Sequence, residues 1–430
     1  MRETEQRLEQ LAVRVLQLPH KVAAREVRDF FRTLPLQSAR ALAESQPKLV
    51  AGLDGAPPQL RYRASQLILV AWQQRLRALV ESNQATDAQR TRLETVDEML
   101  QPVSKGLQIA PDGSRVELMA PRQFLYAEVE GQGRVIEVLG ELETAHNVVV
   151  LIPGMNNDLD RVRAQMDRAQ ALKQAVGPRN AVVVWKDYDA PLGLEEAMST
   201  QSSRAALPRL SRFEAGLDVI KAQYAKTTFI GTSYGSQVLG RALMAGVDPR
   251  NPDGVTPDRA VLVGCPGIDE SVTSAARITP PGTQLFVARA KGDYISYLEK
   301  DGPDPADFPD VFRFETESGS IHVRGHVSYF ELNSESFKNI ARIGRAQLSA
   351  VTPAARTTPE QETQVLVRGV SWAEPLRTVG HSPAAVPLAK VFDGVMALKK
   401  VSSPAAKKPL DGTRNRRDSG PSREPEGPAR

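Results

Sequence analysis

Cysteine and long apolar runs are both scarce in this sequence of 430 residues. Cys265 is the one cysteine, which excludes an intrachain disulfide and a zinc cluster built on cysteines. No window approaches the roughly 18 consecutive apolar residues of a membrane span. The N-terminus has no apolar segment behind a basic start, so no conventional secretory signal is predicted. The expected location is therefore cytoplasmic, with export by a route that uses no such signal left open.

Basic charge is confined to one end of the chain. The net charge is +4, and residues 386–430 carry ten Lys/Arg against five Asp/Glu, a local charge of +5. The remainder therefore carries about −1, so nucleic acid is not a predicted partner. Residues 349–430 are rich in proline, alanine and basic residues and are predicted to be largely disordered. Within them 365–370 could form a short strand and 387–398 a brief helix. At most, this tail is expected to contact anionic surfaces weakly.

The first quarter of the chain is predicted to be helical. Apolar residues recur at helical spacing between Leu8 and Leu16, and further periodic stretches follow. Asp54-Gly55-Ala56-Pro57-Pro58 is a turn signal between them. We predict an N-terminal helical segment over 1–105, with helices over 23–34, 38–49, 60–81 and 87–100. Its apolar stripes are expected to pack against one another; a lid or a partner-binding surface is the alternative.

The middle of the chain, 106–348, alternates strands with helices. Segments with period-two alternation predict antiparallel edge strands at 115–118, 124–129 and 134–139. Continuous apolar runs predict buried parallel strands at 148–152, 181–185, 227–230, 260–263 and 284–288. Predicted helices separate several of these runs, over 159–176, 203–224 and 236–244. This order predicts an α/β domain with a doubly wound, mostly parallel sheet, whose active residues lie at the carboxyl ends of the strands.

A nucleophile elbow is predicted at Ser233. The run Thr227–Ile230 leads into Gly231-Thr232-Ser233-Tyr234-Gly235, and a helix follows. Strand, sharp turn and helix form the context in which Gly-x-Ser-x-Gly exposes a serine hydroxyl above a sheet. Side chains at Gly231 and Gly235 would collide with the neighbouring strand and helix. A small-residue turn without chemistry is the alternative interpretation.

A serine nucleophile needs a base, and the base needs an orienting acid. The histidines after Ser233 are His322, His326 and His381, and His381 lies in the proline-rich tail. Gly325 would let a loop bring His326 to the sheet edge, so His326 is preferred over His322. Asp293 directly follows the strand 284–288, where the orienting acid is expected. Competing aspartates lie in a proline-rich loop, at Asp301, Asp304, Asp307 and Asp310.

The remaining parts of the site are two backbone amides. The Tyr234 amide and the Met155 amide, beside Gly154 in the loop after 148–152, are the predicted oxyanion hole. A plain turn is the alternative for that loop. Cys265 is interpreted as a small buried residue rather than a nucleophile. No metal and no organic cofactor are predicted.

Several motifs together resemble one known family. They are 47–57, 152–156, 231–236, 263–267, 292–293, 302–305 and 325–330. Over about 40 to 345 the chain is similar to an actinobacterial alpha/beta hydrolase family first described as a domain of unknown function. The resemblance implies an alpha/beta hydrolase fold with Ser233, Asp293 and His326 as a triad. Thr232 and Asp301 stand where that family commonly has histidine.

These observations favour a serine hydrolase that cleaves a small-molecule or lipid-like ester, of the carboxylesterase or lipase type. The expected route is an acyl-enzyme, and amide bonds are an open alternative substrate. A second hypothesis is a catalytically silent hydrolase fold that serves as a binding or secretion-associated interaction module. The presence of all three triad residue types argues against it. A third hypothesis is an exported, envelope-active enzyme.

Overall fold

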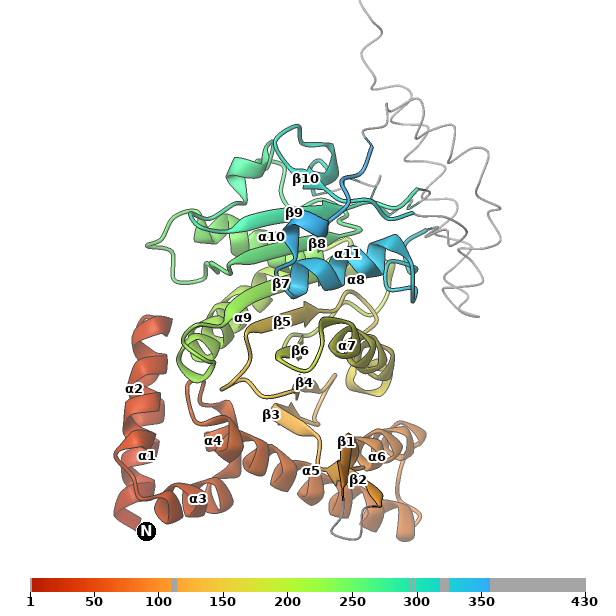
Figure 1. Ribbon diagram of the computed structural model, residues 1–430. Coiled ribbons are helices and arrows are strands. Elements are labelled where there is room, and N and C mark those ends of the chain that lie inside the picture. The colour runs from red at the N-terminus through yellow and green to blue at the C-terminus, as the bar shows by residue number, and fades with distance from the viewer. Residues whose placement is uncertain are drawn as a thin grey trace, which may run out of the picture. The chain divides into compact units, whose positions relative to one another are not determined.

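The chain divides into two units, Met1–Ala385 and Val386–Arg430, and the fold described below lies in the first. The computed structural model describes residues 2–109, 114–291, 293, 295–296, 299, 301–317 and 325–355 (Figure 1). The strand and helix predicted at 365–370 and 387–398, and the basic tail, lie outside the described residues, as do His322 and His381.

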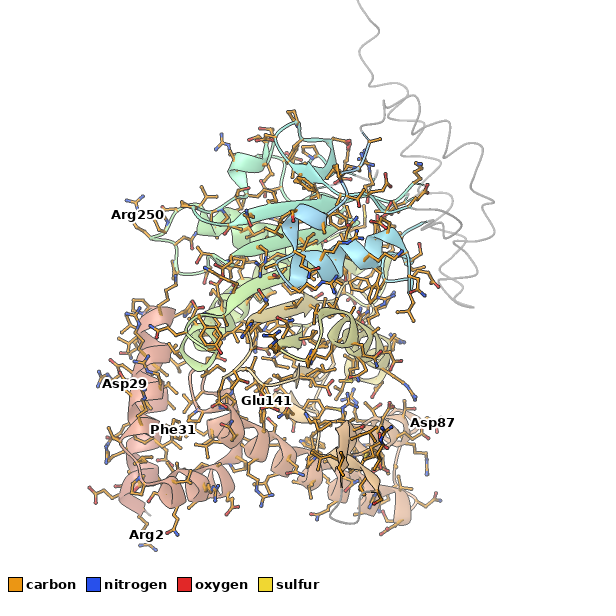
Figure 2. The ribbon with its side chains drawn as sticks, viewed as in Figure 1. Arg2, Asp29, Phe31, Asp87, Glu141 and Arg250 are labelled. Carbon is orange, nitrogen blue, oxygen red and sulfur yellow. The ribbon has the colours of Figure 1, made fainter. Side chains whose placement is uncertain are left out.

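The N-terminal segment is helical, as its periodicity predicts, and it has six helices where the periodicity predicts five. They are α1 (Arg2–Val15), α2 (His20–Arg32), α3 (Leu36–Ser45), α4 (Pro47–Gly52), α5 (Pro58–Glu81) and α6 (Asp87–Met99). The helix predicted over 38–49 was wrong, because the structure breaks it at Gln46. Pro47 explains the break, since the ring of a proline disfavours helical geometry in the preceding residue. Apolar side chains of α1 to α5, including Phe31 (Figure 2), share one buried cluster.

Close contacts of backbone and side chains join this helical segment to the sheet and its helices. The turn after α4 lies against α9 (Gln201–Ile220), where a Cβ on Gly216 would come within 2.8 Å of the Cβ of Asp54. Arg61 of α5 is 2% exposed and donates to the carbonyl of Leu125 at 3.1 Å. The predicted 54–58 turn is therefore a packed junction, and α5 covers the sheet at strand β3 (Gln123–Glu128).

Eight strands form the main sheet, in the order β10-β9-β8-β7-β5-β6-β4-β3. Strand β4 (Arg134–Leu139) runs antiparallel to both neighbours, and the remaining pairs are parallel. The other strands are β5 (Asn147–Ile152), β6 (Asn180–Lys186), β7 (Lys226–Thr232), β8 (Arg259–Val263), β9 (Gln284–Ala288) and β10 (Phe312–Arg313). The mostly parallel sheet is confirmed. The strand predicted at 115–118 instead belongs to β2 (Arg115–Ala120), which pairs with β1 (Val103–Ile109) in a separate two-stranded sheet.

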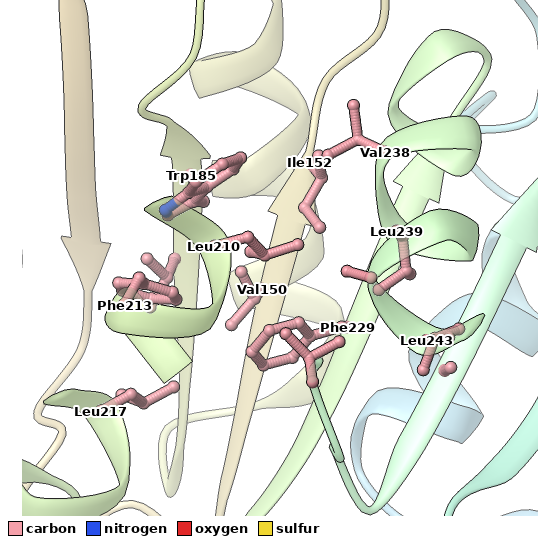
Figure 3. Packing of buried hydrophobic residues seen from close by; sticks show 14 of the residues in the cluster. Val150, Ile152, Trp185, Leu210, Phe213, Leu217, Phe229, Val238, Leu239 and Leu243 are labelled. Atoms are coloured by element: carbon pink, nitrogen blue, oxygen red, sulfur yellow. The ribbon is translucent and has the colours of Figure 1, made fainter. Parts of the chain in front are cut away.

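Helices cover both faces of the main sheet, as doubly wound topology requires. On one face, α9 and α10 (Tyr234–Gly246) pack against β5 and β7. Figure 3 shows Leu210 and Phe213 of α9 beside Val150 of β5. On the other face lie α7 (Arg163–Val176) and α11 (Glu335–Gly344). Short helices η1 (Leu159–Arg161), α8 (Leu194–Ala197), η2 (Ala275–Arg277), η3 (Pro305–Asp307) and η4 (Leu348–Ala350) complete the described elements.

Candidate active site

The turn between β7 and α10 holds Ser233 in a strained backbone conformation. Its φ is +54° and its ψ is −125°, a region that non-glycine residues rarely adopt. A Cβ on Gly231 would lie 2.6 Å from the Cα of Ser236, and one on Gly235 would lie 2.7 Å from the carbonyl oxygen of Pro153. Both glycines are therefore required by close backbone approach, as predicted from the sequence.

A continuous chain of hydrogen bonds links Ser233, His326 and Asp293. The Oγ of Ser233 lies 2.6 Å from Nε2 of His326. On the other side of the ring, Nδ1 lies 2.9 Å and 3.1 Å from the two carboxylate oxygens of Asp293. The three residues follow β7, β9 and β10, so the parallel strands bring them to one edge of the sheet. The structure thus assembles the three side chains chosen from the sequence.

Asp293 is fully buried, yet its carboxylate is held in the charged form. Burial raises its pKa, but the positive charge and hydrogen bond of His326, and bonds from Tyr329 and Ser296, bring the pKa below its ordinary value. The Tyr329 hydroxyl donates to Oδ2 at 2.5 Å, and the Ser296 hydroxyl at 3.1 Å. The Ile295 amide donates to Oδ1 at 3.1 Å. Hydrogen bonds to a carboxylate favour its charged state.

Gly264 leaves the space that this arrangement needs. Its φ is +58°, and an added Cβ would lie 2.9 Å from Oδ2 of Asp293 and 3.2 Å from Cε1 of His326. The ring of Tyr329 would be 3.0 Å away. A side chain at this position would therefore press on the aspartate, the histidine and the tyrosine at once.

The predicted oxyanion loop lies directly against the elbow. A Cβ on Gly154 would be 2.9 Å from the Cβ of Ser233 and 3.3 Å from the amide nitrogen of Tyr234. The Tyr234 amide is the first of α10, so it has no acceptor within its own helix. Met155 follows Gly154 and is partly buried against the core below. The Tyr234 amide and the loop at Gly154, both singled out from the sequence, therefore lie next to Ser233.

The competing aspartates have other partners. Asp301 accepts from the side-chain amide of Gln237 at 2.6 Å. Asp304 and Asp307 both pair with Arg289, and Asp310 accepts from the amide of Ala275. Cys265 is 2% exposed, and burial raises the pKa of its thiol, as expected for a packing residue rather than a nucleophile.

Sequence reasoning missed four side chains that support the site: Tyr329, Ser296, Tyr188 and Asn157. Tyr329 stands three residues after His326, and that proximity is the one signal in the sequence. The Tyr188 hydroxyl donates to the carbonyl of Pro153 at 2.5 Å, from a separate loop. The Asn157 side chain donates to the carbonyls of Gly154 and Met155.

The described residues contain no group of three or more His, Cys, Asp or Glu side chains arranged to hold a metal ion. Within the same ranges, no helix combines the length and apolar character that crossing a membrane requires.

The sheet order, the antiparallel β4 and the strained serine between β7 and α10 define an alpha/beta hydrolase fold. Residues 128–302 match the model of a family described as alpha/beta hydrolase.

Two mycobacterial proteins are similar in sequence. "Uncharacterized protein Rv2079" of Mycobacterium tuberculosis is 25% identical over 383 residues, which cover 76% of this chain and 56% of that protein. The chain thus spans little more than half the length of that relative. "Uncharacterized protein Mb0988c" of Mycobacterium bovis is 28% identical over 200 residues, covering 42% of this chain and 71% of that protein. Among solved structures, the thermostable carboxylesterase EstE1, cloned from a metagenomic library, is 13% identical with a TM-score of 0.32, covering 65% of this chain and 98% of that one.

Proposed function

We propose that this protein is a serine hydrolase that cleaves an ester, or a related acyl bond, through an acyl-enzyme. The observation that carries the proposal is the unbroken hydrogen-bond chain from Ser233 through His326 to Asp293. In this proposal Ser233 is the nucleophile, His326 the general base and Asp293 the orienting acid. A hydroxyl 2.6 Å from an imidazole nitrogen is within reach for proton transfer.

The first half of the proposed reaction forms the acyl-enzyme. As the Oγ of Ser233 bonds to the substrate carbonyl carbon, its proton passes to Nε2 of His326. The carbonyl oxygen becomes an oxyanion, which the amides of Tyr234 and Met155 stabilise. When the tetrahedral intermediate collapses, the carbon–oxygen bond to the leaving alcohol breaks. The imidazolium then returns the proton to that alcohol.

The second half of the reaction releases the acid. A water molecule gives a proton to Nε2 of His326 and attacks the acyl carbon. The bond to Ser233 breaks, and Oγ takes the proton back from the imidazolium. In both halves the charge of Asp293 stabilises the imidazolium, and the lowered pKa of this carboxyl keeps it charged.

The burial of Asp293 favours the enzyme over the silent binding fold. A binding scaffold has no use for a fully buried carboxylate that is kept charged beside a histidine, because burying a charge costs free energy. The strained φ of Ser233 adds a second cost at the same place. Within the enzyme class, a small-molecule or lipid-like ester of the carboxylesterase type is the proposed substrate.

Labelling with a fluorophosphonate probe tests this proposal. The wild type is compared with Ser233→Ala and His326→Ala. Ser271→Ala is the control, because Ser271 is an exposed serine that bonds to Asp269. We expect labelling of the wild type and the control, and loss of labelling in the two site variants.

The same samples are then assayed with p-nitrophenyl esters of increasing acyl length. Turnover that depends on Ser233 would establish a hydrolase and rank its acyl preference. A folded wild type that neither reacts with the probe nor turns over any ester would refute the enzyme and leave the binding fold.

A further inference from the structure

Three consecutive peptide groups of the predicted oxyanion loop are fixed by hydrogen bonds from outside the nucleophile elbow. The Tyr188 hydroxyl donates to the carbonyl of Pro153 at 2.5 Å and lies 3.3 Å from that of Gly154. The Asn157 side chain donates to the carbonyl of Gly154 at 2.9 Å and to that of Met155 at 2.8 Å. The Gly154 carbonyl therefore accepts from Asn157 and lies next to the Tyr188 hydroxyl, whose proton is directed to Pro153.

We call the hydrogen bonds from Tyr188 and Asn157 to the loop carbonyls the clamp. Because the peptide group is planar, the clamp also sets the direction of the Met155 N–H. The carbonyl of Gly154 and the N–H of Met155 belong to one planar trans peptide group and point in opposite directions. Fixing that carbonyl toward Tyr188 and Asn157 therefore fixes the Met155 N–H on the other side. A Cβ added to Gly154 would lie 2.9 Å from the Cβ of Ser233 and 3.3 Å from the Tyr234 nitrogen, so the loop faces the elbow there.

The neighbouring amide is already engaged. The Asn156 N–H donates to the carbonyl of Pro191 at 2.8 Å, which withdraws it from the site. Asn156 also has a φ of +58°, a conformation that asparagine tolerates better than most residues. Hydrogen bonds on both sides of Asn156 hold this turn in place. Of the Met155 and Asn156 amides, only that of Met155 is therefore left to meet an oxyanion.

The clamp itself is rigid. Tyr188 is 2% exposed, and its ring stacks on Trp185 with centroids 5.8 Å apart and an angle of 9° between the planes. Burial raises the pKa of the Tyr188 hydroxyl well above its ordinary value, so it remains a donor. Asn157 is 7% exposed. Buried side chains held by packing keep a catalytic group in a fixed geometry before substrate arrives.

We propose that Tyr188 and Asn157 are positioning residues that preform the oxyanion hole by fixing the carbonyls of Pro153 and Gly154 and thereby aiming the Met155 amide. This inference rests on the proposed function. It predicts an effect on the transition state, where the oxyanion carries charge, more than on binding of the neutral ester.

Tyr188→Phe tests the inference, because it removes the hydroxyl and keeps the ring on Trp185. Tyr224→Phe is the matched control: it removes a hydroxyl that donates to the carbonyl of Thr144 at 3.2 Å, on a side chain that is 62% exposed. The measurements are kcat and KM for p-nitrophenyl butyrate, the rate of fluorophosphonate labelling, and thermal unfolding. Asn157→Ala provides a second test through the other donor, should Tyr188→Phe not fold.

Removal of a whole oxyanion donor costs about 100- to 1000-fold in kcat. A donor that is present but loosened should cost less, so we expect kcat and the labelling rate to fall on the order of 10-fold with KM nearly unchanged. The pH at which activity is half lost on the acid side should stay that of the wild type, because the base is untouched. The control should retain wild-type kinetics.

Two results would overturn the inference. If folded Tyr188→Phe and Asn157→Ala keep kcat and the labelling rate within about twofold of the wild type, the clamp has a structural role alone. A lower unfolding temperature with unchanged kcat leads to the same conclusion. A wild type that is not labelled would instead refute the proposed serine hydrolase. If the wild type is labelled, unchanged kinetics in the two variants refute only the positioning role of Tyr188 and Asn157.

Discussion

Two buried aspartates after strand β9, Asp293 and Asp304, lie in opposite electrostatic environments. The two residues are 0% and 1% exposed, so burial penalises both charges alike. The pKa of Asp293 nevertheless lies below its ordinary value, whereas burial raises that of Asp304 to about 7. The difference must therefore come from the groups that surround each carboxylate.

The donors explain the difference. Asp293 accepts from His326, Tyr329, Ser296 and the Ile295 amide. Asp304 accepts from Arg289 at 3.1 Å and from one backbone amide. The guanidinium of Arg289 is shared with Asp307, whose own charge acts against that of Asp304. At equal burial, the pKa is therefore lowered at one carboxylate and raised at the other, according to the donors that each receives.

The largest expected effect is on turnover. Asp293→Asn should lower kcat for p-nitrophenyl butyrate on the order of 10⁴-fold, because the amide cannot stabilise the imidazolium and favours the wrong tautomer of His326. Asp304→Asn is the matched variant and should keep kcat within about threefold, because Asp304 does not contact Ser233 or His326 in the described residues. Equal losses in the two variants would contradict the distinction drawn between these carboxylates.

A second test acts on the space around Asp293. Gly264→Ala should lower kcat on the order of 100-fold, because the new methyl group would press on Asp293 and His326. Gly282→Ala is the control: its φ is +86°, yet an added Cβ would meet nothing within 4 Å. Both variants should lose about 1 kcal/mol of stability from the positive φ, and only Gly264→Ala should lose activity. Comparable kcat in both would show that crowding at Gly264 is harmless.

The sequence was sufficient for the parts of the fold that depend on local pattern. Continuous apolar runs marked the buried strands, and Gly231 and Gly235 marked the elbow around Ser233 because close backbone packing admits glycine alone. Asp293 could be selected because it directly follows β9, where the topology brings the carboxyl ends of strands together.

What the sequence could not reveal depends on contacts between distant segments. Nothing in a tyrosine three residues after His326 shows that its hydroxyl returns to Asp293. Tyr188 reaches the loop at Pro153 from 35 residues away. The positive φ of Gly264 likewise has no local signature in Gly264-Cys265-Pro266-Gly267. Such residues follow from tertiary packing, which periodicity and turn composition do not encode.

A third test removes one donor from Asp293. Tyr329→Phe should lower kcat on the order of 10-fold, because a carboxylate with fewer hydrogen bonds is less firmly placed against the imidazole. Its unshared charge should also hold the imidazolium proton more tightly, so the acid limb of the kcat/KM profile should move to higher pH. The hydroxyl also accepts from the Ala290 amide at 2.8 Å, so stability should fall by about 1 to 3 kcal/mol. An acid limb that does not move would assign Tyr329 to structure alone.

The fourth test concerns pH and should affect activity least. The pKa values of Asp304 and Asp293 predict how the free energy of unfolding changes with pH. Asp304 has a folded pKa of about 7, above the roughly 3.9 of an unfolded aspartate. A raised folded pKa means that the folded state keeps its proton longer. The stability that this provides is present in full below about pH 4 and is lost as pH rises toward 7. Asp293 has the opposite sign: its depressed pKa provides stability above about pH 4 that is lost as pH falls.

Denaturant unfolding of the wild type, Asp304→Asn and Asp293→Asn at several pH values between about 2 and about 8 measures both signs. Relative to the wild type, Asp304→Asn should gain stability between about pH 4 and pH 7, by a few kcal/mol at most, because an amide has no proton to lose. Asp293→Asn should be less stable than the wild type above about pH 4, and this difference should shrink as pH falls below about 4. If the two difference curves had the same slope, the donors around the two carboxylates would not be what separates them, and their shared burial would have to dominate instead.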